Sequence, residues 1–237
     1  MGVGGATVLG ALVGFIFKDI SKKFSDTVLA FAGGVMLIAS INGLILPSLE
    51  YVSNLTLFVS VSGIAVGALI IFLLEKTVPH ITKVAEDENS NKRSKVLLFT
   101  LAIAIHNLPE GIAAGVGFGT GDSSGALTLA LGIALQNIPE GMVIISPMIS
   151  TGISPKKTFL YASLTGVIEI IGTFIGYFAV SIASVFLPFA LALAGGSMLY
   201  VISEEIIPET HSEGNKTSVS FAFLFGFCFM LALGYII

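Results

Sequence analysis

The chain has 237 residues, of which 54% are hydrophobic and only 11% charged, and its mean hydropathy is +0.97. A soluble domain carries about 25% charged residues, so this composition excludes an ordinary soluble protein and predicts an all-α polytopic membrane protein. The net charge of −4 says little, because the charges are confined to loops and a few special sites. A single cysteine, Cys228, excludes an intramolecular disulfide and a cysteine-based zinc site. The lipid bilayer is the expected surrounding, and no nucleic acid partner is expected.

Eight apolar segments, separated by charges, Pro or Gly/Ser clusters, are candidate spans, since crossing a bilayer takes about 20 residues. The first is short, and the break between the sixth and seventh is weak, so seven spans remain an alternative to the better-fitting eight. The segments lie at 3–17, 27–49, 55–75, 96–118, 125–149, 158–182, 187–208 and 217–237.

The basic residues alternate from one connection to the next. All eleven Lys and Arg residues fall after the first, third, fifth or seventh segment, which makes those connections cytoplasmic by the positive-inside rule. Both termini are then expected outside, with the protein in the cell membrane. Residues 1–237 are interpreted as one transmembrane domain, with a polar cytoplasmic loop at about 79–95 in which His80 is expected to be solvated.

Two pairs of segments repeat along the chain. LAFAGGVML at Leu29–Leu37 matches LALAGGSML at Leu191–Leu199, and HNLPEG from His106 matches QNIPEG from Gln136. The members of each pair lie on spans that run in opposite directions, which predicts inverted repeats: spans 1–3 against 6–8, and span 4 against 5. Secondary transporters have this architecture, with a binding site near the midplane. Chance recurrence of small packing residues accounts for one such match better than for two.

The HNLPEG and QNIPEG motifs place polar groups at membrane depth. His106 and Glu110 are four residues apart and share a helix face, and Glu140 repeats the position of Glu110 on the next span. A proline before each Glu frees carbonyl groups of the preceding turn. Glu169 is a third membrane carboxylate, and no Lys or Arg lies within a span to neutralise it.

Each lipid-buried carboxylate costs about 2.5–3.5 kcal/mol, so the pattern predicts a bound divalent cation. Imidazole favours zinc, iron and similar ions over calcium. The metal residues predicted for this centre are His106, Asn107, Glu110, Gln136, Asn137, Glu140 and Glu169.

Further polar residues are weaker candidates. The seventh span ends in ISEEIIPETH, which either simply reaches water or forms an exit path for metal through Glu204, Glu205, Glu209 and His211. Met36 is more often a packing residue than a ligand. Glu50 and Asp122 face outside and can attract cations, but nothing in the sequence distinguishes them from ordinary loop acids.

The paired PEG motifs, the eight spans and the ISEEIIPETH ending resemble the ZIP (Zrt/Irt-like) metal transporter family, in particular its GufA-like prokaryotic branch. The resemblance covers the whole chain. It implies a secondary transporter that moves Zn²⁺, with Fe²⁺, Mn²⁺ and Cd²⁺ as further substrates, into the cytoplasm without a prosthetic group.

The resemblance also implies a binuclear centre. One site would use His106, Glu110, Gln136 and Glu140, with Met36 a contributor; the other would use Asn107, Asn137, Glu140 and Glu169, with Glu110 bridging. Some relatives carry Asp where Asn137 stands, which puts occupancy of the second site in question.

The family is similar to elevator transporters, in which spans 1, 4, 5 and 6 move against a scaffold of the others that forms a homodimer. A selective metal channel with the same ligands is the alternative. A membrane metallohydrolase is a remote one, because HExxH is absent and His106 is the only histidine expected at membrane depth.

Overall fold

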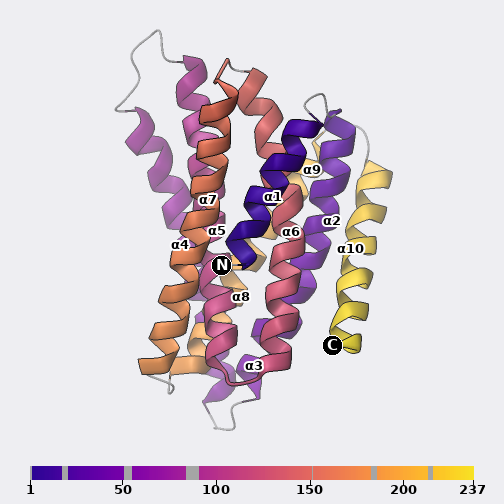
Figure 1. The fold of residues 1–237 in the computed structure, drawn as a ribbon. Helices are drawn as coiled ribbons and strands as arrows, with labels where there is room; N and C mark the ends of the chain where they lie inside the picture. Colours follow the sequence, from indigo (N-terminus) through magenta and orange to yellow (C-terminus); the bar gives the residue numbers. More distant parts are fainter. Residues whose placement is uncertain are drawn as a thin grey trace.

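The computed structural model describes residues 2–17, 21–50, 55–83, 91–150, 152–182, 186–212 and 216–237. All regular structure in these ranges is helical, and the long helices stand side by side in one bundle (Figure 1). The elements are α1 (Gly2–Ile16), α2 (Lys22–Ser40), η1 (Ile41–Ile45), α3 (Leu46–Leu49), α4 (Thr56–Lys83), α5 (Asn91–Gly119), α6 (Ser123–Ser150), α7 (Pro155–Ile182), α8 (Leu187–Val201), η3 (Ile202–Ile206), α9 (Ile207–His211) and α10 (Lys216–Ile236).

Six helical stretches of the described chain are long and apolar enough to cross a membrane. They are Lys22–Leu49, Thr56–Thr77, Ser123–Ser146, Pro155–Val180, Leu187–His211 and Lys216–Ile236. Helix α1 is apolar but has only 15 residues, and α5, with 29 residues, is not among the six. The polytopic all-helical class is therefore confirmed, whereas the full set of eight spans stays a prediction.

The connection between α4 and α5 is narrower than the loop expected at about 79–95. Helix α4 continues to Lys83, so His80 lies in a helix, and α5 already begins at Asn91. The remainder of the expected loop, residues 84–90, lies outside the described residues.

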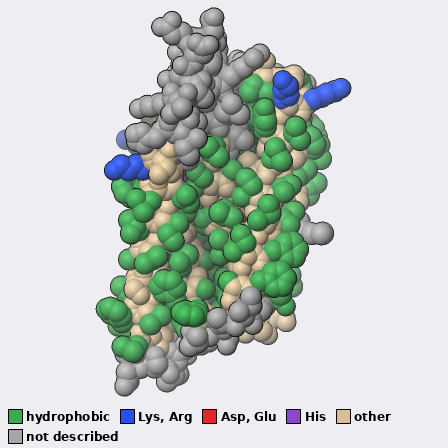
Figure 2. Space-filling model, turned by 90° about the vertical axis from the view of Figure 1, so that its left-hand side faces the viewer, with side chains coloured by type: hydrophobic (Ala, Val, Ile, Leu, Met, Phe, Trp, Pro, Cys, Tyr) green, Lys and Arg blue, Asp and Glu red, His purple; other side chains and the backbone are tan. Residues whose placement is uncertain are grey.

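The surface suits a lipid environment. Large apolar side chains such as Phe58, Phe178 and Phe221 are exposed on the outward faces of α4, α7 and α10. In Figure 2 hydrophobic side chains cover most of the face in view, and the visible Lys and Arg side chains lie toward its upper end. Such a surface is stable where hydrocarbon replaces water around the bundle, with the cations at one boundary.

Two π-helical segments, η1 and η3, interrupt the spans that carry the AGG repeats. Each is followed within one turn by a proline, Pro47 or Pro208. Proline has no N–H to donate and its ring clashes with the carbonyl of the preceding turn, which the wider π-turn relieves. The η3 segment carries Glu205, so this local irregularity belongs to a predicted functional position.

Glycines let the site-bearing helices touch through their backbones. Helix α5 packs closely on α7, and α1 on α6. A Cβ atom placed on Gly111 would lie 2.0 Å from the carbonyl oxygen of Glu169, and one on Gly141 would lie 2.2 Å from that of Thr7. Real side chains do not tolerate such distances, so the glycine of each PEG motif fixes a neighbouring helix beside its glutamate.

Candidate metal centre

The two PEG motifs meet at the centre of the bundle. The Nε2 atom of Gln136 on α6 donates a hydrogen bond to Oε1 of Glu110 on α5 over 2.6 Å, and both side chains are fully buried. Helix α5 continues through Pro109, so the glutamate stays on the helix face that α6 covers. The second carboxylate oxygen of Glu110, Oε2, and the side-chain oxygen of Gln136, Oε1, have no hydrogen-bond partner among the described residues.

The asparagines of the two motifs are buried beside this pair. Asn107 precedes Glu110 by three residues on the same helix face, and neither its Oδ1 nor its Nδ2 atom has a partner in the described part of the chain. The same holds for Oδ1 of Asn137, which adjoins Gln136. An unsatisfied buried polar group costs about 1–3 kcal/mol, and the two motifs together carry four such oxygens: Glu110 Oε2, Gln136 Oε1, Asn107 Oδ1 and Asn137 Oδ1. Oxygens of this kind are suited to a cation.

Glu169 on α7 is held by neighbours from two other helices. Asn137 Nδ2 donates to Oε1 of Glu169 over 2.6 Å, and the hydroxyl of Thr7 on α1 donates to Oε2 over 3.3 Å. The same Nδ2 atom also lies 3.2 Å from the carbonyl oxygen of Val3. Each carboxylate oxygen of Glu169 therefore accepts a hydrogen bond from a neutral donor.

The remaining residues predicted for the centre lie around it. Glu140 is half-buried on α6, one turn after Gln136. Met36 is buried on α2, in the same apolar cluster as Ile133 of α6 and Ala113 of α5. The structure thus places Met36 in the wall between α2 and the site-bearing helices.

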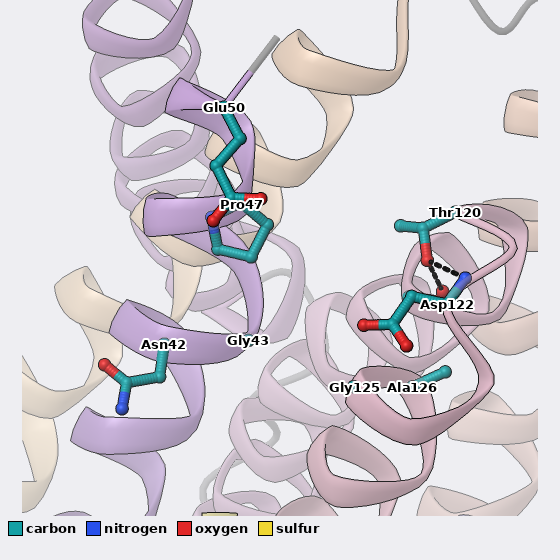
Figure 3. Close-up of a pocket in the computed structure, with 9 residues that line it drawn as sticks. Asn42, Gly43, Pro47, Glu50, Thr120, Asp122, Gly125 and Ala126 are labelled. Carbon is teal, nitrogen blue, oxygen red and sulfur yellow. Dashed lines mark hydrogen bonds between the residues drawn. The ribbon is translucent and has the colours of Figure 1, made fainter.

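A pocket of about 480 Å³ opens at the end of the bundle where α3 and the α5–α6 connection lie (Figures 1 and 3). One wall carries Asn42 and Glu50, and the opposite wall carries Asp122, whose carboxylate points toward the first wall in Figure 3. Asp122 also caps α6, because its Oδ1 accepts a hydrogen bond of 3.1 Å from the backbone nitrogen of Ser124. Glu50 and Asp122, which nothing in the sequence distinguishes from ordinary loop acids, therefore line the same cavity.

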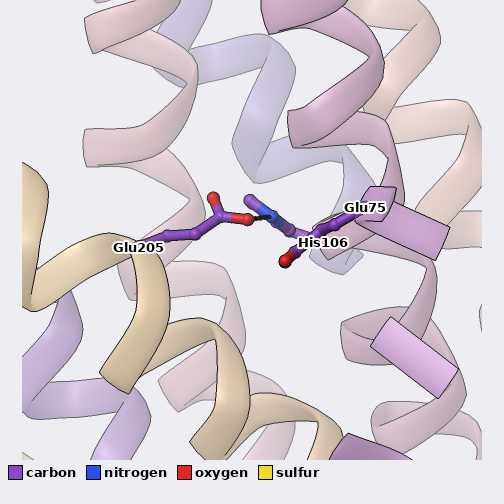
Figure 4. A group of neighbouring side chains, drawn as sticks. All are labelled: Glu75, His106 and Glu205. Atoms are coloured by element: carbon purple, nitrogen blue, oxygen red, sulfur yellow. Dashed lines mark hydrogen bonds and ion pairs between the residues drawn. The ribbon is translucent and has the colours of Figure 1, made fainter. Parts of the chain in front are cut away.

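A second cluster lies on the other side of the centre, formed by Glu75 of α4, His106 of α5 and Glu205 of η3 (Figure 4). One ligand atom from each residue lies within 4.8 Å of the others, and all three residues are half-buried. Nε2 of His106 is 2.5 Å from Oε1 of Glu205. Two carboxylates and an imidazole are a donor set suited to zinc.

The other residues predicted for the exit path are separate from this cluster. Glu204 and Glu209 are exposed, and Glu209 forms an ion pair of 2.5 Å with Lys22 at the start of α2. His211 Nδ1 is 2.9 Å from the carbonyl oxygen of Ile207, and its Nε2 faces Ser220 of α10. Of the four, Glu205 alone joins His106 within the described residues.

Two residues of the site were not predicted. Glu75 ends an apolar stretch just before Lys76. A carboxylate on the apolar side of the first basic residue after a span indicates a candidate site residue. Thr7 gives no such signal, because a lone hydroxyl in a helix commonly bonds to its own backbone. Only the repeat marks it: Thr7 and Glu169 are separated by 162 positions, the same separation as Leu29 and Leu191.

Several known transporters are similar to this chain over nearly its whole length. The family profile described as "ZIP Zinc transporter" matches residues 85–234. The chain is 36% identical to the zinc transporter GufA of Myxococcus xanthus over 97% of its own length and 94% of that protein. It is 35% identical to the zinc transporter ZIPB of Bordetella bronchiseptica, over 96% of the chain and 76% of that protein. It is 30% identical to the zinc transporter ZIP11 of Xenopus tropicalis, over 97% of the chain and 93% of that protein.

Proposed function

Because the chain belongs to the ZIP family of zinc transporters, we propose that it moves Zn²⁺ across the cell membrane into the cytoplasm. Fe²⁺, Mn²⁺ and Cd²⁺, which share ligand preferences with Zn²⁺, are further substrates in this proposal. Membership of a transporter family removes the membrane metallohydrolase alternative: the protein is not an enzyme. The metal ion is cargo rather than a resident cofactor.

The unpartnered oxygens between α5 and α6 carry the proposal. Glu110 Oε2, Gln136 Oε1 and Asn107 Oδ1 are buried acceptors without hydrogen-bond partners in the described chain. A divalent cation would neutralise Glu110 and supply a partner to all three oxygens at once. Glu140, His106 and Met36 complete the ligand set in the proposal, and Asn137 with Glu169 forms the adjoining part of the centre.

The proposed route runs between the two clusters that flank the centre. Cations would collect in the outer pocket beside Glu50 and Asp122, pass to Glu110, and leave past Glu75 and Glu205. His106 belongs to both the centre and the cytoplasmic cluster in this scheme. It lies one helical turn before Glu110 and contacts Glu205, so its imidazole is suited to hand the ion onward.

We further propose eight spans with inverted repeats and an elevator-type motion. Close glycine contacts come in matched pairs: Gly10 against Ile138 and Gly172 against Leu108 join α1 to α6 and α7 to α5. Gly34 against Phe223 likewise joins α2 to α10, as Gly196 against Ile64 joins α8 to α4.

These contacts join the helices in four pairs. We assign α1, α5, α6 and α7 to one unit, because Gly4 of α1 also meets the backbone of Gly166 of α7, and α2, α4, α8 and α10 to the other. The first unit would carry the metal against the second, which would form the homodimer. Both termini lie outside in this proposal, because the Lys- and Arg-bearing connections are then cytoplasmic.

Uptake into proteoliposomes tests the function. Purified protein is expected to give saturable ⁶⁵Zn²⁺ uptake, reduced in turn by competing Cd²⁺, Fe²⁺ and Mn²⁺. Repeating the measurement with a pH gradient imposed or collapsed identifies the driving force. Empty liposomes provide the background. Flux that fails to saturate and follows the electrochemical gradient alone would support the channel alternative instead.

A further inference from the structure

We propose that the centre carries one cation at a time, because the amide nitrogen of Asn137 takes the place of a second ion. In this inference, which rests on the proposed function, Glu169 and Thr7 are positioning residues rather than ligands. They hold Asn137 so that its carbonyl oxygen serves the single ion between α5 and α6.

The orientation of the Asn137 amide follows from Val3. A backbone carbonyl oxygen only accepts hydrogen bonds, so the Asn137 atom 3.2 Å from it must be the nitrogen. The same nitrogen has its second proton available for Glu169 Oε1, 2.6 Å away. Both protons of the amide are thereby directed to acceptors on α1 and α7.

The amide nitrogen of Asn137 lies between two acceptors and stabilises their negative charge, as a bound cation would. Val3 O and Glu169 Oε1 both present negative charge toward one buried point, and an NH₂ group fills that point with positive hydrogen atoms. An aspartate there would offer no donor and would face Glu169 with a second negative charge. Two such carboxylates would need a metal ion or a shared proton between them, as like charges buried at short range cannot both persist unpaired; at neutral pH and excess Zn²⁺ we expect the metal ion.

The other oxygen of Glu169 also accepts a hydrogen bond. Its Oε2 accepts from the hydroxyl of Thr7 over 3.3 Å, and the backbone of α7 at Glu169 is fixed against Gly111. With its nitrogen held in this way, Asn137 leaves only Oδ1 without a partner in the described chain. Outer carboxylates orient metal ligands in this manner, and here an amide takes the usual place of an imidazole.

Counting bound ions tests the inference. Full-length protein in detergent is dialysed against buffered ZnCl₂, and zinc per chain is measured by mass spectrometry. The count is made in a Glu205→Gln background, so that the cytoplasmic cluster contributes no ion. We expect one ion per chain, and two after Asn137→Asp. Asn137→Leu is the matched control, since it removes the amide without adding a carboxylate, and the count should not rise above one.

The outcomes separate this inference from the function on which it rests. If the Glu205→Gln variant binds two ions and the added Glu169→Gln substitution lowers the count to one, Glu169 is a ligand of a second ion. That result overturns the inference but leaves the proposed function intact. A count that stays at one after Asn137→Asp also overturns it. A count of zero in the background overturns the metal centre itself.

Thr7 provides a second measurement. Thr7→Val keeps the shape but removes the donor, and we expect zinc affinity to fall about tenfold, the lower end of losses for an outer-shell residue. Thr7→Ser restores the hydroxyl and should restore the affinity, with thermal stability equal in both variants. Equal affinity in Val and Ser variants would show that Thr7 only packs.

Discussion

Gln136 donates to Glu110 across 2.6 Å, although the two residues occupy non-equivalent positions of the two motifs. Glu110 is the glutamate of HNLPEG, and Gln136 is the first residue of QNIPEG. In a symmetric arrangement the equivalent contact would join His106 to Glu140. His106 instead lies 2.5 Å from Glu205, so the two motifs are alike in sequence but differ in use. The centre is therefore asymmetric: the imidazole of His106 lies on the side of Glu75 and Glu205, and the equivalent position of the other motif is the amide of Gln136.

Removing the charge of Glu110 should strongly reduce transport. In Glu110→Gln the buried ion loses a charged ligand, and we expect zinc uptake into proteoliposomes to fall at least about tenfold, since loss of a charged interaction in a buried site costs well above about 1.4 kcal/mol. Glu110→Asp keeps the charge and is expected to retain part of the uptake. Protein content and thermal stability are measured in parallel. Full uptake by the Gln variant would remove Glu110 from the centre.

Gly111 should be intolerant of a single methyl group. Its Cβ would meet the carbonyl oxygen of Glu169 at 2.0 Å, so Gly111→Ala must separate α5 from α7. We expect a loss of about 1–3 kcal/mol, as in other overpacked cores, visible as a lower melting temperature in detergent.

Gly5 of α1 provides the control for this substitution, because no atom lies within 4 Å of the position that an added methyl group would take. Gly5→Ala should leave the melting temperature unchanged or raise it, as alanine is the better helix former. Equal melting temperatures for Gly111→Ala and the unaltered protein would contradict the close contact of α5 with α7.

The cluster of Glu75, His106 and Glu205, which is cytoplasmic in the proposed orientation, should govern release of the ion. Glu75→Gln and Glu205→Gln each remove a carboxylate beside His106, and we expect a lower maximal uptake rate with a smaller change in KM. Glu204→Gln is the matched control, because Glu204 adjoins Glu205 but is exposed. If Glu204→Gln slows uptake as much as Glu205→Gln does, general charge at this end of the bundle matters more than the cluster.

Much of this arrangement was predictable from the sequence, for identifiable reasons. The positions of the helices follow from the lengths of the apolar segments. The PEG motifs are recognisable as functional because a carboxylate in lipid is costly. The hydrogen-bond partners were not predictable. Asn137 is predicted as a ligand from the motif alone, but the motif does not indicate that its Nδ2 atom donates to Glu169 and lies 3.2 Å from the carbonyl oxygen of Val3. Such a role depends on the packing of α1 against α6, which residue spacing within one helix does not specify.

The pocket beside Glu50 and Asp122, which faces outside in the proposed orientation, should influence capture of cations rather than transport itself. Glu50 and Asp122 face one cavity of about 480 Å³ from opposite walls. Neutralising both in Glu50→Gln with Asp122→Asn should raise KM for zinc by about tenfold at low ionic strength, the lower end of electrostatic focusing effects. Asparagine still caps α6, so the maximal rate should hold.

Salt distinguishes this capture effect from a structural one. Exposed charges are largely screened beyond about 8 Å at physiological ionic strength. The difference in KM between the unaltered protein and the double variant is therefore expected to shrink as salt is raised. Asp122→Asn alone, which preserves the cap, should show about half of the effect on a logarithmic scale. A KM difference independent of salt would mean that the substitutions deform the pocket, and would remove the two carboxylates from the proposed route.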